Sequence, residues 1–241
     1  MLLRDRREAG RELAARLAER QRDGTLTDPI VLALPRGGVP VADEIATALG
    51  APLDVLVVRK IGAPYNPELG VGAVAGEAPP LYDRRTLAAL GLTEERLAPT
   101  VARERTELRR REELYRGGRP MPDVRGRTVV VVDDGLATGV TARAALRAVR
   151  NMAPARVVMA VPVCAAEAAR LVAAEADELV YLHQPRPFSS VGQWYLDFDQ
   201  VGDDEVIRTL TAARTDADTG ADTGAGADTG GGNGGTSTDG G

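Results

Sequence analysis

Four consecutive valines, Val129–Val132, constrain the fold of this chain more than any other feature. β-branched residues favour strands, and a short continuous apolar run indicates a strand buried on both faces, as in a parallel sheet covered by helices. Two acids, Asp133 and Asp134, end the run, and a helical pattern follows at 139–151. The segment therefore predicts a central strand, a polar turn and a helix, as in a βαβ unit.

Other short apolar runs alternate with helical patterns along the chain. We expect strands at 30–34, 53–58, 156–161 and 178–182, and helices at 4–22, 39–49 and 165–174. Strands that alternate with helices indicate right-handed βαβ units. The sequence therefore predicts an α/β fold with a mostly parallel five-stranded sheet flanked by helices, in one domain over residues 1–213.

Three segments fall outside this alternation. Residues 61–80 are rich in Gly, Pro and Ala, which is typical of a long flexible loop. Residues 93–116 are strongly charged and predict a helical insert with i,i+4 ion pairs such as Glu107 with Arg111. Residues 214–241 contain mostly Gly, Ala, Asp and Thr, and we expect a disordered acidic tail because such a segment buries little apolar surface.

Composition excludes several classes of protein. The net charge of −5 argues against a nucleic-acid-binding surface, so a nucleic-acid partner is not expected. Cys164 is the single cysteine, so an intrachain disulfide is excluded. The N-terminus lacks the apolar core of a secretory signal, and no apolar run is long enough to span a membrane. We therefore expect a soluble, cytoplasmic protein.

The turn after the valine run has the chemistry of a sugar phosphate site. The first N–H groups of a helix lack intrahelical partners and form a cradle for anions, which Gly139 lets a ligand approach and to which Thr138 and Thr141 add hydroxyl donors. The carboxylates of Asp133 and Asp134 can accept hydrogen bonds from vicinal hydroxyls and can help to hold Mg²⁺. The turn contains no lysine, which excludes the phosphate loop of nucleotide triphosphatases.

Residues 129–141 resemble the motif of type I phosphoribosyltransferases that binds 5-phosphoribosyl 1-pyrophosphate (PRPP), with four apolar residues, two acids and a turn that opens a helix. The resemblance covers roughly residues 25–200 and implies the five-stranded fold of that family. It implies that Asp133 and Asp134 hold the ribose hydroxyls. It also implies that the backbone of the following turn binds the 5′-phosphate, through Ala137, Thr138, Gly139, Val140 and Thr141.

A second motif, Pro35-Arg36-Gly37-Gly38, resembles the pyrophosphate loop of the same family. Glycines let backbone N–H groups reach a diphosphate, and Arg36 can supply positive charge, which gives it a catalytic role. The family often has a cis peptide in this loop, and we expect one near Arg36-Gly37. By itself this motif would indicate only an ordinary tight turn. Its position before the acid motif supports the assignment to the pyrophosphate loop.

Arg59 and Lys60, at the end of the second predicted strand, are also similar to residues of the family. Basic side chains there would neutralise the leaving pyrophosphate, so both are expected to be catalytic. The segment 61–80 then falls where the family carries a flexible catalytic loop that closes over the site and excludes water.

Residues 184–200 correspond to the family's hood, the small subdomain that receives the nucleobase. Phe188 and Trp194 lie in this aromatic-rich segment and are expected to stack on a planar acceptor. The resemblance further gives Asp197 a role in holding Mg²⁺, beside Asp133 and Asp134.

Together these features predict a Mg²⁺-dependent phosphoribosyltransferase that moves the 5-phosphoribosyl group of PRPP to a nitrogen acceptor, with a nucleobase as the leading candidate, and that releases pyrophosphate in nucleotide salvage. A homodimer is possible, as is frequent in this fold. The alternative is a PRPP-binding regulator of the same fold, because Ala137 replaces the aspartate that oxopurine enzymes often carry, although adenine-type members also have alanine there. A phosphoacceptor receiver domain is disfavoured because it needs a lysine after the acids, and Lys60 precedes them.

Overall fold

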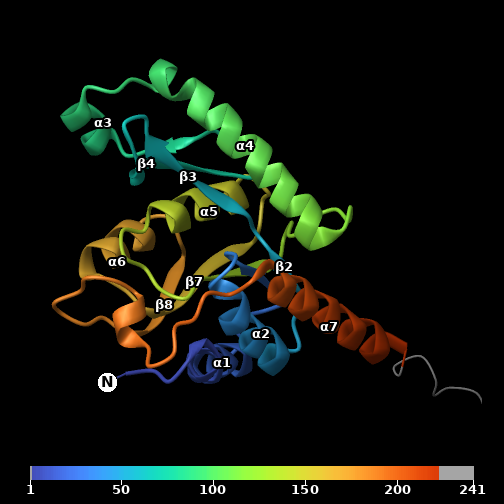
Figure 1. Ribbon diagram of the computed structural model, residues 1–241. Coiled ribbons are helices and arrows are strands. Elements are labelled where there is room, and N and C mark those ends of the chain that lie inside the picture. Colours follow the sequence, from blue (N-terminus) through green and yellow to red (C-terminus); the bar gives the residue numbers. More distant parts are fainter. Residues whose placement is uncertain (1, 223–241) are drawn as a thin grey trace, which may run out of the picture.

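A central sheet of five parallel strands forms the middle of the protein, and its strand order is β2-β1-β6-β7-β8 (Figure 1). The computed structural model describes residues 2–222 of the chain. The strands are β1 (Pro29–Ala33), β2 (Leu53–Val55), β6 (Thr128–Val132), β7 (Arg156–Val163) and β8 (Glu178–His183). The predicted α/β fold with a five-stranded sheet is confirmed, and every pairing within this sheet is parallel.

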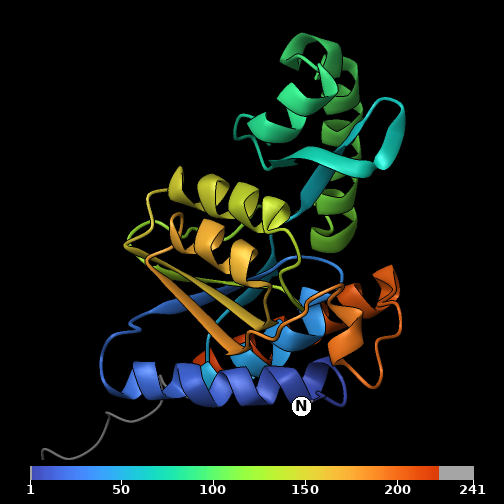
Figure 2. The same ribbon diagram turned by 90° about the vertical axis from the view of Figure 1, so that its left-hand side faces the viewer.

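Helices cover both faces of the sheet, as a parallel sheet requires. Helices α1 (Arg6–Arg22) and α2 (Gly38–Leu49) lie on one face, and α5 (Val140–Arg150) and α6 (Ala166–Ala173) lie on the other (Figures 1 and 2). Successive side chains of a strand point to opposite faces. In β6, Val130 and Val132 therefore join the core cluster that contains α1 and α2, whereas Val129 and Val131 join the cluster of α5 and α6.

The segment 61–80 was expected to be a loose loop, and this expectation is wrong. It belongs to a second, antiparallel sheet formed by β3 (Val58–Ala63), β4 (Asn66–Ala75) and β5 (Leu81–Tyr82). This sheet packs on α5 through small side chains, with Ala73 and Ala75 in one buried cluster with Ala144 and Ala148. Small residues allow this close contact, and they also remove the alternation of large apolar residues by which strands are recognised.

The strand predicted at 53–58 is divided between the two sheets. β2 ends at Val55, and β3 begins at Val58 in the second sheet. Arg59 and Lys60 therefore lie inside β3, opposite Val74 and Ala73 of β4. They do not lie at the carboxyl edge of the central sheet, where the sequence had placed them.

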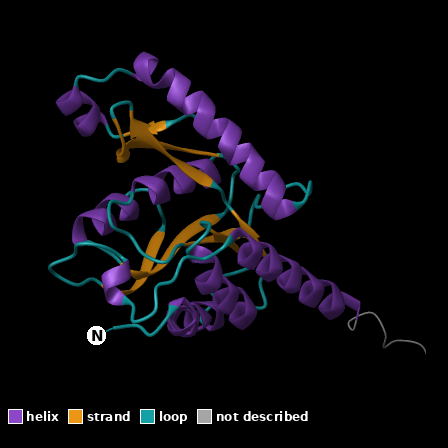
Figure 3. Cartoon of the chain, viewed as in Figure 1, coloured by secondary structure: helices purple, strands orange, loops and turns teal. Residues whose placement is uncertain are grey.

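The charged segment forms α4 (Glu94–Arg116), which confirms that it is helical, and a short helix, α3 (Arg84–Leu90), precedes it. Figure 3 shows both helices beside the second sheet. The end of α4 is anchored to the central sheet by a buried ion pair, in which Arg116 Nε lies 3.2 Å from Asp54 Oδ1. Arg116 also donates to the carbonyl of Val55. Arg214 lies farther from the same carboxylate, at 3.9 Å.

The C-terminal helix, α7 (Asp203–Asp222), was not predicted, and it extends past residue 214, where a disordered tail was expected to begin. Val206 and Leu210 are one helical turn apart and fully buried, so they fix the start of the helix on the core. Once such a nucleus exists, each further residue adds a hydrogen bond at lower cost. The rest of the predicted tail, residues 223–241, lies outside the described residues.

Within residues 2–222, none of the helices combines the length and the apolar character that a crossing of the lipid bilayer requires.

Arg116→Ala should destabilise the fold by about 3 kcal/mol, because it leaves the carboxylate of Asp54 buried and only distantly compensated by Arg214. Urea unfolding would measure this loss. Arg110→Ala is the matched control on the same helix, because it breaks an exposed pair with Glu107 and should cost less than about 1 kcal/mol. Equal losses in the two variants would contradict the anchoring role of Arg116.

Candidate functional site

The carboxyl ends of the neighbouring strands β1 and β6 bring the two predicted turns together. Leu34 N donates to the carbonyl of Val132 at 2.8 Å, which extends the strand contact beyond β1. A Cβ atom at Gly37 would lie 2.0 Å from Asp134 Oδ2, and one at Gly38 would lie 2.6 Å from the oxygen of Val132. Only glycine permits this approach. The loop 35–38 and the acid turn 133–141 therefore form one site, as predicted.

A cis peptide bond occurs between Pro35 and Arg36. The sequence predicted one near Arg36-Gly37, so the observed bond lies one position earlier in the same loop.

Helices α2 and α5 both begin at this site, and both have glycine at the N-cap. Neither Gly37 nor Gly139 provides a side-chain hydrogen bond to the first turn of its helix. Gly139 has a φ of 75°, a left-handed conformation that favours glycine. The first N–H groups of α5 therefore lack a side-chain acceptor from the cap, and a helix N-terminus of this kind binds anions. At the start of α2, Gly38 N and Val39 N already donate to the carbonyls of Leu34 and Arg36, and Pro40 has no N–H.

The predicted phosphate turn is exposed to solvent at its tip. Ala137 and Thr138 are exposed, Val140 and Thr141 are half-buried, and Gly139 is buried. Ala137, Thr138 and Val140 line a cleft of about 710 Å³ that continues between α3 and the α5–α6 layer. The base of the turn is fixed, because the N–H of Leu136 donates to the carbonyl of Val163 at 2.9 Å. A rigid base with an accessible tip suits the binding of a small anion.

Asp133 and Asp134 form a pair of like charges in a largely buried site. Burial raises the pKa of Asp133 well above its ordinary value, and the adjacent charge of Asp134 raises it further. Burial also raises the pKa of Asp134, and this rise is opposed by the guanidinium of Arg6. The N–H of Asp134 donates to Asp133 Oδ1 at 2.9 Å, which fixes the first carboxylate. Such a pair favours ligands that bring hydroxyl donors or a cation.

Arg6 of α1 and Tyr195 of the hood contact the acid pair, although neither was among the predicted site residues. Arg6 Nε donates to Asp134 Oδ2 at 2.9 Å, and the hydroxyl of Tyr195 donates to the carbonyl oxygen of Asp134 at 2.7 Å. Both contacts join residues that are far apart in the sequence. They follow from the tertiary fold, and no local motif could have indicated them.

Arg36 lies in the loop as predicted, and it is tethered by residues that were not predicted. Its Nη1 lies 3.8 Å from Asp203 Oδ1 at the start of α7. The same carboxylate oxygen accepts a hydrogen bond from the hydroxyl of Tyr115 at 2.6 Å. Burial, together with this hydrogen bond, raises the pKa of Tyr115 to about 12, so the phenol remains a donor. The helical insert and the C-terminal helix therefore meet at the predicted pyrophosphate loop.

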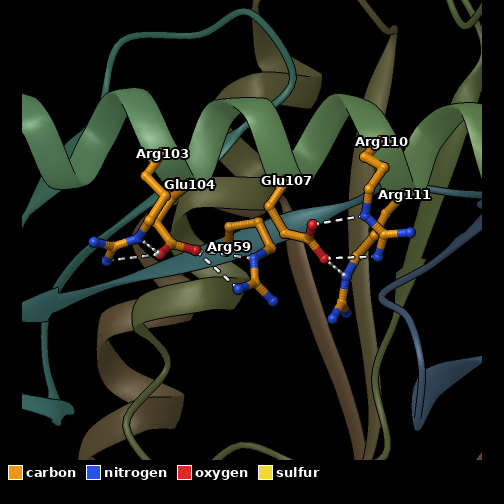
Figure 4. Close-up of polar contacts among 6 residues, drawn as sticks. All are labelled: Arg59, Arg103, Glu104, Glu107, Arg110 and Arg111. Carbon is orange, nitrogen blue, oxygen red and sulfur yellow. Dashed lines mark hydrogen bonds and ion pairs between the residues drawn. The ribbon is translucent and has the colours of Figure 1, made fainter.

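The side chain of Arg59 forms an ion pair with Glu104 of α4. Its Nη2 and Nε lie 2.8 and 3.1 Å from Glu104 Oε2, and Arg103 contacts the other oxygen of Glu104 at 3.2 Å (Figure 4). Lys60 is exposed beside Arg59, and both line a cleft of about 340 Å³ against α4. The structure thus joins Arg59 to the helical insert, whereas the two turns at β1 and β6 form their site without it. The catalytic roles of Arg59 and Lys60 stay predictions.

The hood, residues 184–200, is hydrogen-bonded to the start of the chain through backbone groups. Leu3 N donates to the carbonyl of Trp194 at 2.9 Å, and Asp197 N donates to the carbonyl of Arg4 at 2.8 Å. The rings of Phe188 and Trp194 are half-buried against the main core, with centroids 6.2 Å apart. Their stacking on an acceptor stays a prediction.

The role of Asp197 in holding Mg²⁺ stays a prediction, because its side chain is not grouped with the acid pair in the described residues. Its side chain is exposed, and residues 2–222 contain no cluster of three or more Asp, Glu, His or Cys side chains that could hold a metal ion. The remaining carboxylates still fit Mg²⁺, because this ion is commonly held by one or two carboxylates together with oxygens of a phosphorylated substrate. Asp133 and Asp134 provide two, and their mutual repulsion favours a cation nearby.

Comparisons with known proteins agree with this geometry. A family model described as a phosphoribosyl transferase domain matches residues 3–188. A Mycobacterium tuberculosis protein, recorded in two strains and provisionally named a phosphoribosyl transferase, is 44% identical over 212 residues, which cover 88% of this chain. The match covers only 47% of that protein, so this chain spans less than half the length of its curated relatives.

Among solved structures, the crystal structure of TT1426 from Thermus thermophilus is similar over nearly its whole length. It is 46% identical, has a TM-score of 0.74, and the match covers 88% of this chain and 99% of that one.

Asp133→Asn should stabilise the protein when no ligand is bound. A carboxyl whose folded-state pKa is raised opposes folding once the pH exceeds its ordinary value, and the amide removes this charge while keeping the oxygen that accepts from Asp134 N. We expect a gain of about 1 kcal/mol at pH 7, seen as a rise of roughly 2–4 °C in Tm. The gain should disappear as the pH falls to about 4.

Asp134→Asn is the matched comparison. It should raise Tm by less than Asp133→Asn does, because the pKa of Asp134 is also raised by burial but Arg6, which opposes this rise, loses its carboxylate partner. A gain in Asp134→Asn as large as that in Asp133→Asn would contradict the division of roles between the two acids.

Proposed function

The chain belongs to the phosphoribosyltransferase family, and from that premise we propose that it transfers the 5-phosphoribosyl group of PRPP to a nitrogen acceptor, a nucleobase, in nucleotide salvage. One observation carries the proposal: a half-buried acid pair lies beside two glycine-capped helix N-termini, at the carboxyl ends of adjacent strands. In parallel α/β sheets ligands bind at this edge. The anion cradle at the start of α5 and the guanidinium of Arg36, together with the hydroxyl-accepting pair, match a ribose that carries phosphate groups at both ends.

Each part of the site then has a role. The carboxylates of Asp133 and Asp134 accept hydrogen bonds from the ribose hydroxyls, and the backbone of residues 137–141 binds the 5′-phosphate. The guanidinium of Arg36, in the loop 35–38, binds the diphosphate. Mg²⁺, when bound, neutralises charge on the diphosphate, and Asp133 and Asp134 are the protein groups that would hold it together with substrate oxygens.

The reaction breaks the bond between C1′ of the ribose and the pyrophosphate oxygen and forms a bond between C1′ and the acceptor nitrogen, whose proton is lost to solvent. No protein nucleophile is required. The site acts by placing the two reactants and by stabilising the charge that develops on the leaving group. We further propose that the β3–β4 hairpin closes over the site and carries Arg59 and Lys60 toward the leaving pyrophosphate, which requires release of Arg59 from Glu104.

A second candidate is a PRPP-binding regulator. Two observations favour it: Ala137 gives the turn no carboxylate to accept the acceptor's proton, and Arg59 is held by Glu104. Such a protein would bind PRPP through the same acid pair but would release little or no pyrophosphate.

Pyrophosphate release from PRPP and Mg²⁺, measured across a panel of nucleobases and simple amines, tests the transferase directly. Release with one acceptor establishes the activity and names the substrate. PRPP binding by calorimetry without release from any acceptor would favour the regulator.

The double variant Asp133→Asn, Asp134→Asn should lose PRPP affinity by at least about tenfold, because neutral amides hold neither the ribose hydroxyls nor Mg²⁺ as well as carboxylates do. Asp43→Asn, a surface acid that pairs with Arg7, is the control and should bind PRPP normally. Unchanged affinity in the double variant would remove this site from the proposal.

A further inference from the structure

Asp203, the first residue of α7, is contacted from two other parts of the chain. Its Oδ1 accepts a hydrogen bond from the hydroxyl of Tyr115 at 2.6 Å and lies 3.8 Å from Nη1 of Arg36. Tyr115 is the penultimate residue of α4, and Figure 1 shows this end of α4 beside the start of α7. One carboxylate oxygen therefore joins the helical insert, the C-terminal helix and the loop 35–38.

Both groups that make the hydrogen bond are anchored. The ring of Tyr115 is only 2% exposed and belongs to the main core, and the next residue, Arg116, is held by its buried ion pair with Asp54. The start of α7 is fixed by the buried side chains of Val206 and Leu210. A hydrogen bond from a phenol to a carboxylate is charge-assisted and strong. The carboxylate of Asp203 is therefore held in one orientation beside the loop.

Arg36 is held less tightly than its partners. Its side chain is 29% exposed, and its contact with Asp203, at 3.8 Å, suits an ion pair but is too long for a hydrogen bond. The contact therefore leaves the five N–H donors of the guanidinium for a ligand. Binding removes rotamer freedom from a long side chain, and a partner that already restricts the side chain reduces that loss. Asp203 can thus orient Arg36 without using its hydrogen-bond donors.

We propose that Asp203 and Tyr115 are positioning residues, which hold Arg36 where it binds the diphosphate of PRPP. The inference rests on the proposed function, because it takes the diphosphate as the ligand of Arg36. It adds two residues outside both sequence motifs and gives the helical insert and α7 a shared task at the diphosphate end of the site. The turn that binds the 5′-phosphate does not depend on them, because its base is fixed by the bond from Leu136 to Val163.

The first test measures how freely Arg36 moves when no ligand is present. Phenylglyoxal modifies arginine side chains, and peptide mass spectrometry gives the rate at Arg36 relative to that at the exposed Arg170. Asp203→Asn and Tyr115→Phe should each raise this relative rate about threefold, because Arg36 is released from its partner. An unchanged rate at Arg36 in both variants would overturn the proposal, whatever the protein binds.

Each variant has a matched control. Asp204→Asn removes an exposed acid from the same first turn of α7, so it changes the charge near the helix dipole equally. Tyr181→Phe removes a hydroxyl from β8. Both controls should leave the modification rate of Arg36 as it is in the wild type. A rise as large as that in Asp203→Asn would show that the effect is not specific to Asp203 and Tyr115, and it would overturn the proposal.

The second test compares two ligands that occupy opposite ends of the proposed site. Calorimetry measures the binding of pyrophosphate with Mg²⁺ and, separately, of ribose 5-phosphate. Both variants should bind pyrophosphate about fivefold more weakly, since Arg36 must then be ordered on binding, and should bind ribose 5-phosphate as the wild type does. A merely structural role would weaken both ligands, so an equal loss for the two would overturn the proposal. If the wild type binds neither ligand while the modification rates shift, the proposed function fails and the role of Asp203 and Tyr115 toward Arg36 stands.

Tyr115→Phe separates position from charge and provides the readout if Asp203→Asn does not fold. It keeps the buried ring and the carboxylate of Asp203, and it removes only the hydroxyl that fixes this carboxylate. Tighter binding of pyrophosphate in Asp203→Asn would show that the carboxylate competes with the ligand for Arg36, and it would overturn the positioning role.

Discussion

The parallel pairing of β1 with β6 is the constraint on which the rest of the site depends. Their register, with Ala33 opposite Val132, ends both strands at the same level. α2 and α5 must therefore begin side by side, and their glycine caps allow two backbones and a carboxylate to fit within one small volume. At this edge the backbone sets the geometry of the site, and the side chains add charge.

Charge compensation at this edge comes from distant parts of the chain. Arg6 reaches Asp134 from the first helix, and Asp203 reaches Arg36 from the last one, where it is also bonded by Tyr115 of the helical insert. A half-buried like-charge pair is costly, and the contacts made by Arg6 reduce that cost while leaving Asp133 free to bind a ligand. The peripheral helices thus contribute to the site as well as to the core.

The sequence predicts those parts whose signal is local. The run of valines identified β6 to within one residue, and the acids and glycines beside it identified the two turns, because strand burial and helix N-termini impose strong rules on neighbouring residues. The second sheet was missed because its contact with α5 relies on alanine and glycine, which resemble a loop in composition. Arg6 and the displacement of Arg59 into β3 depend on how distant segments meet, which a local pattern does not encode.

The contacts of Arg6 also impose an order on biosynthesis. Its partners, Asp134 and Asp199, follow it by 128 and 193 residues. During translation the first helix is complete long before the partners of Arg6 exist. Asp133 and Asp134 then leave the ribosome before the hood, residues 184–200, has been made. Closing such long loops is slow relative to forming a helix. The binding site is therefore among the last parts of the protein to mature, and a nascent chain that stalls before the hood would carry the ligand-binding motifs without the means to use them.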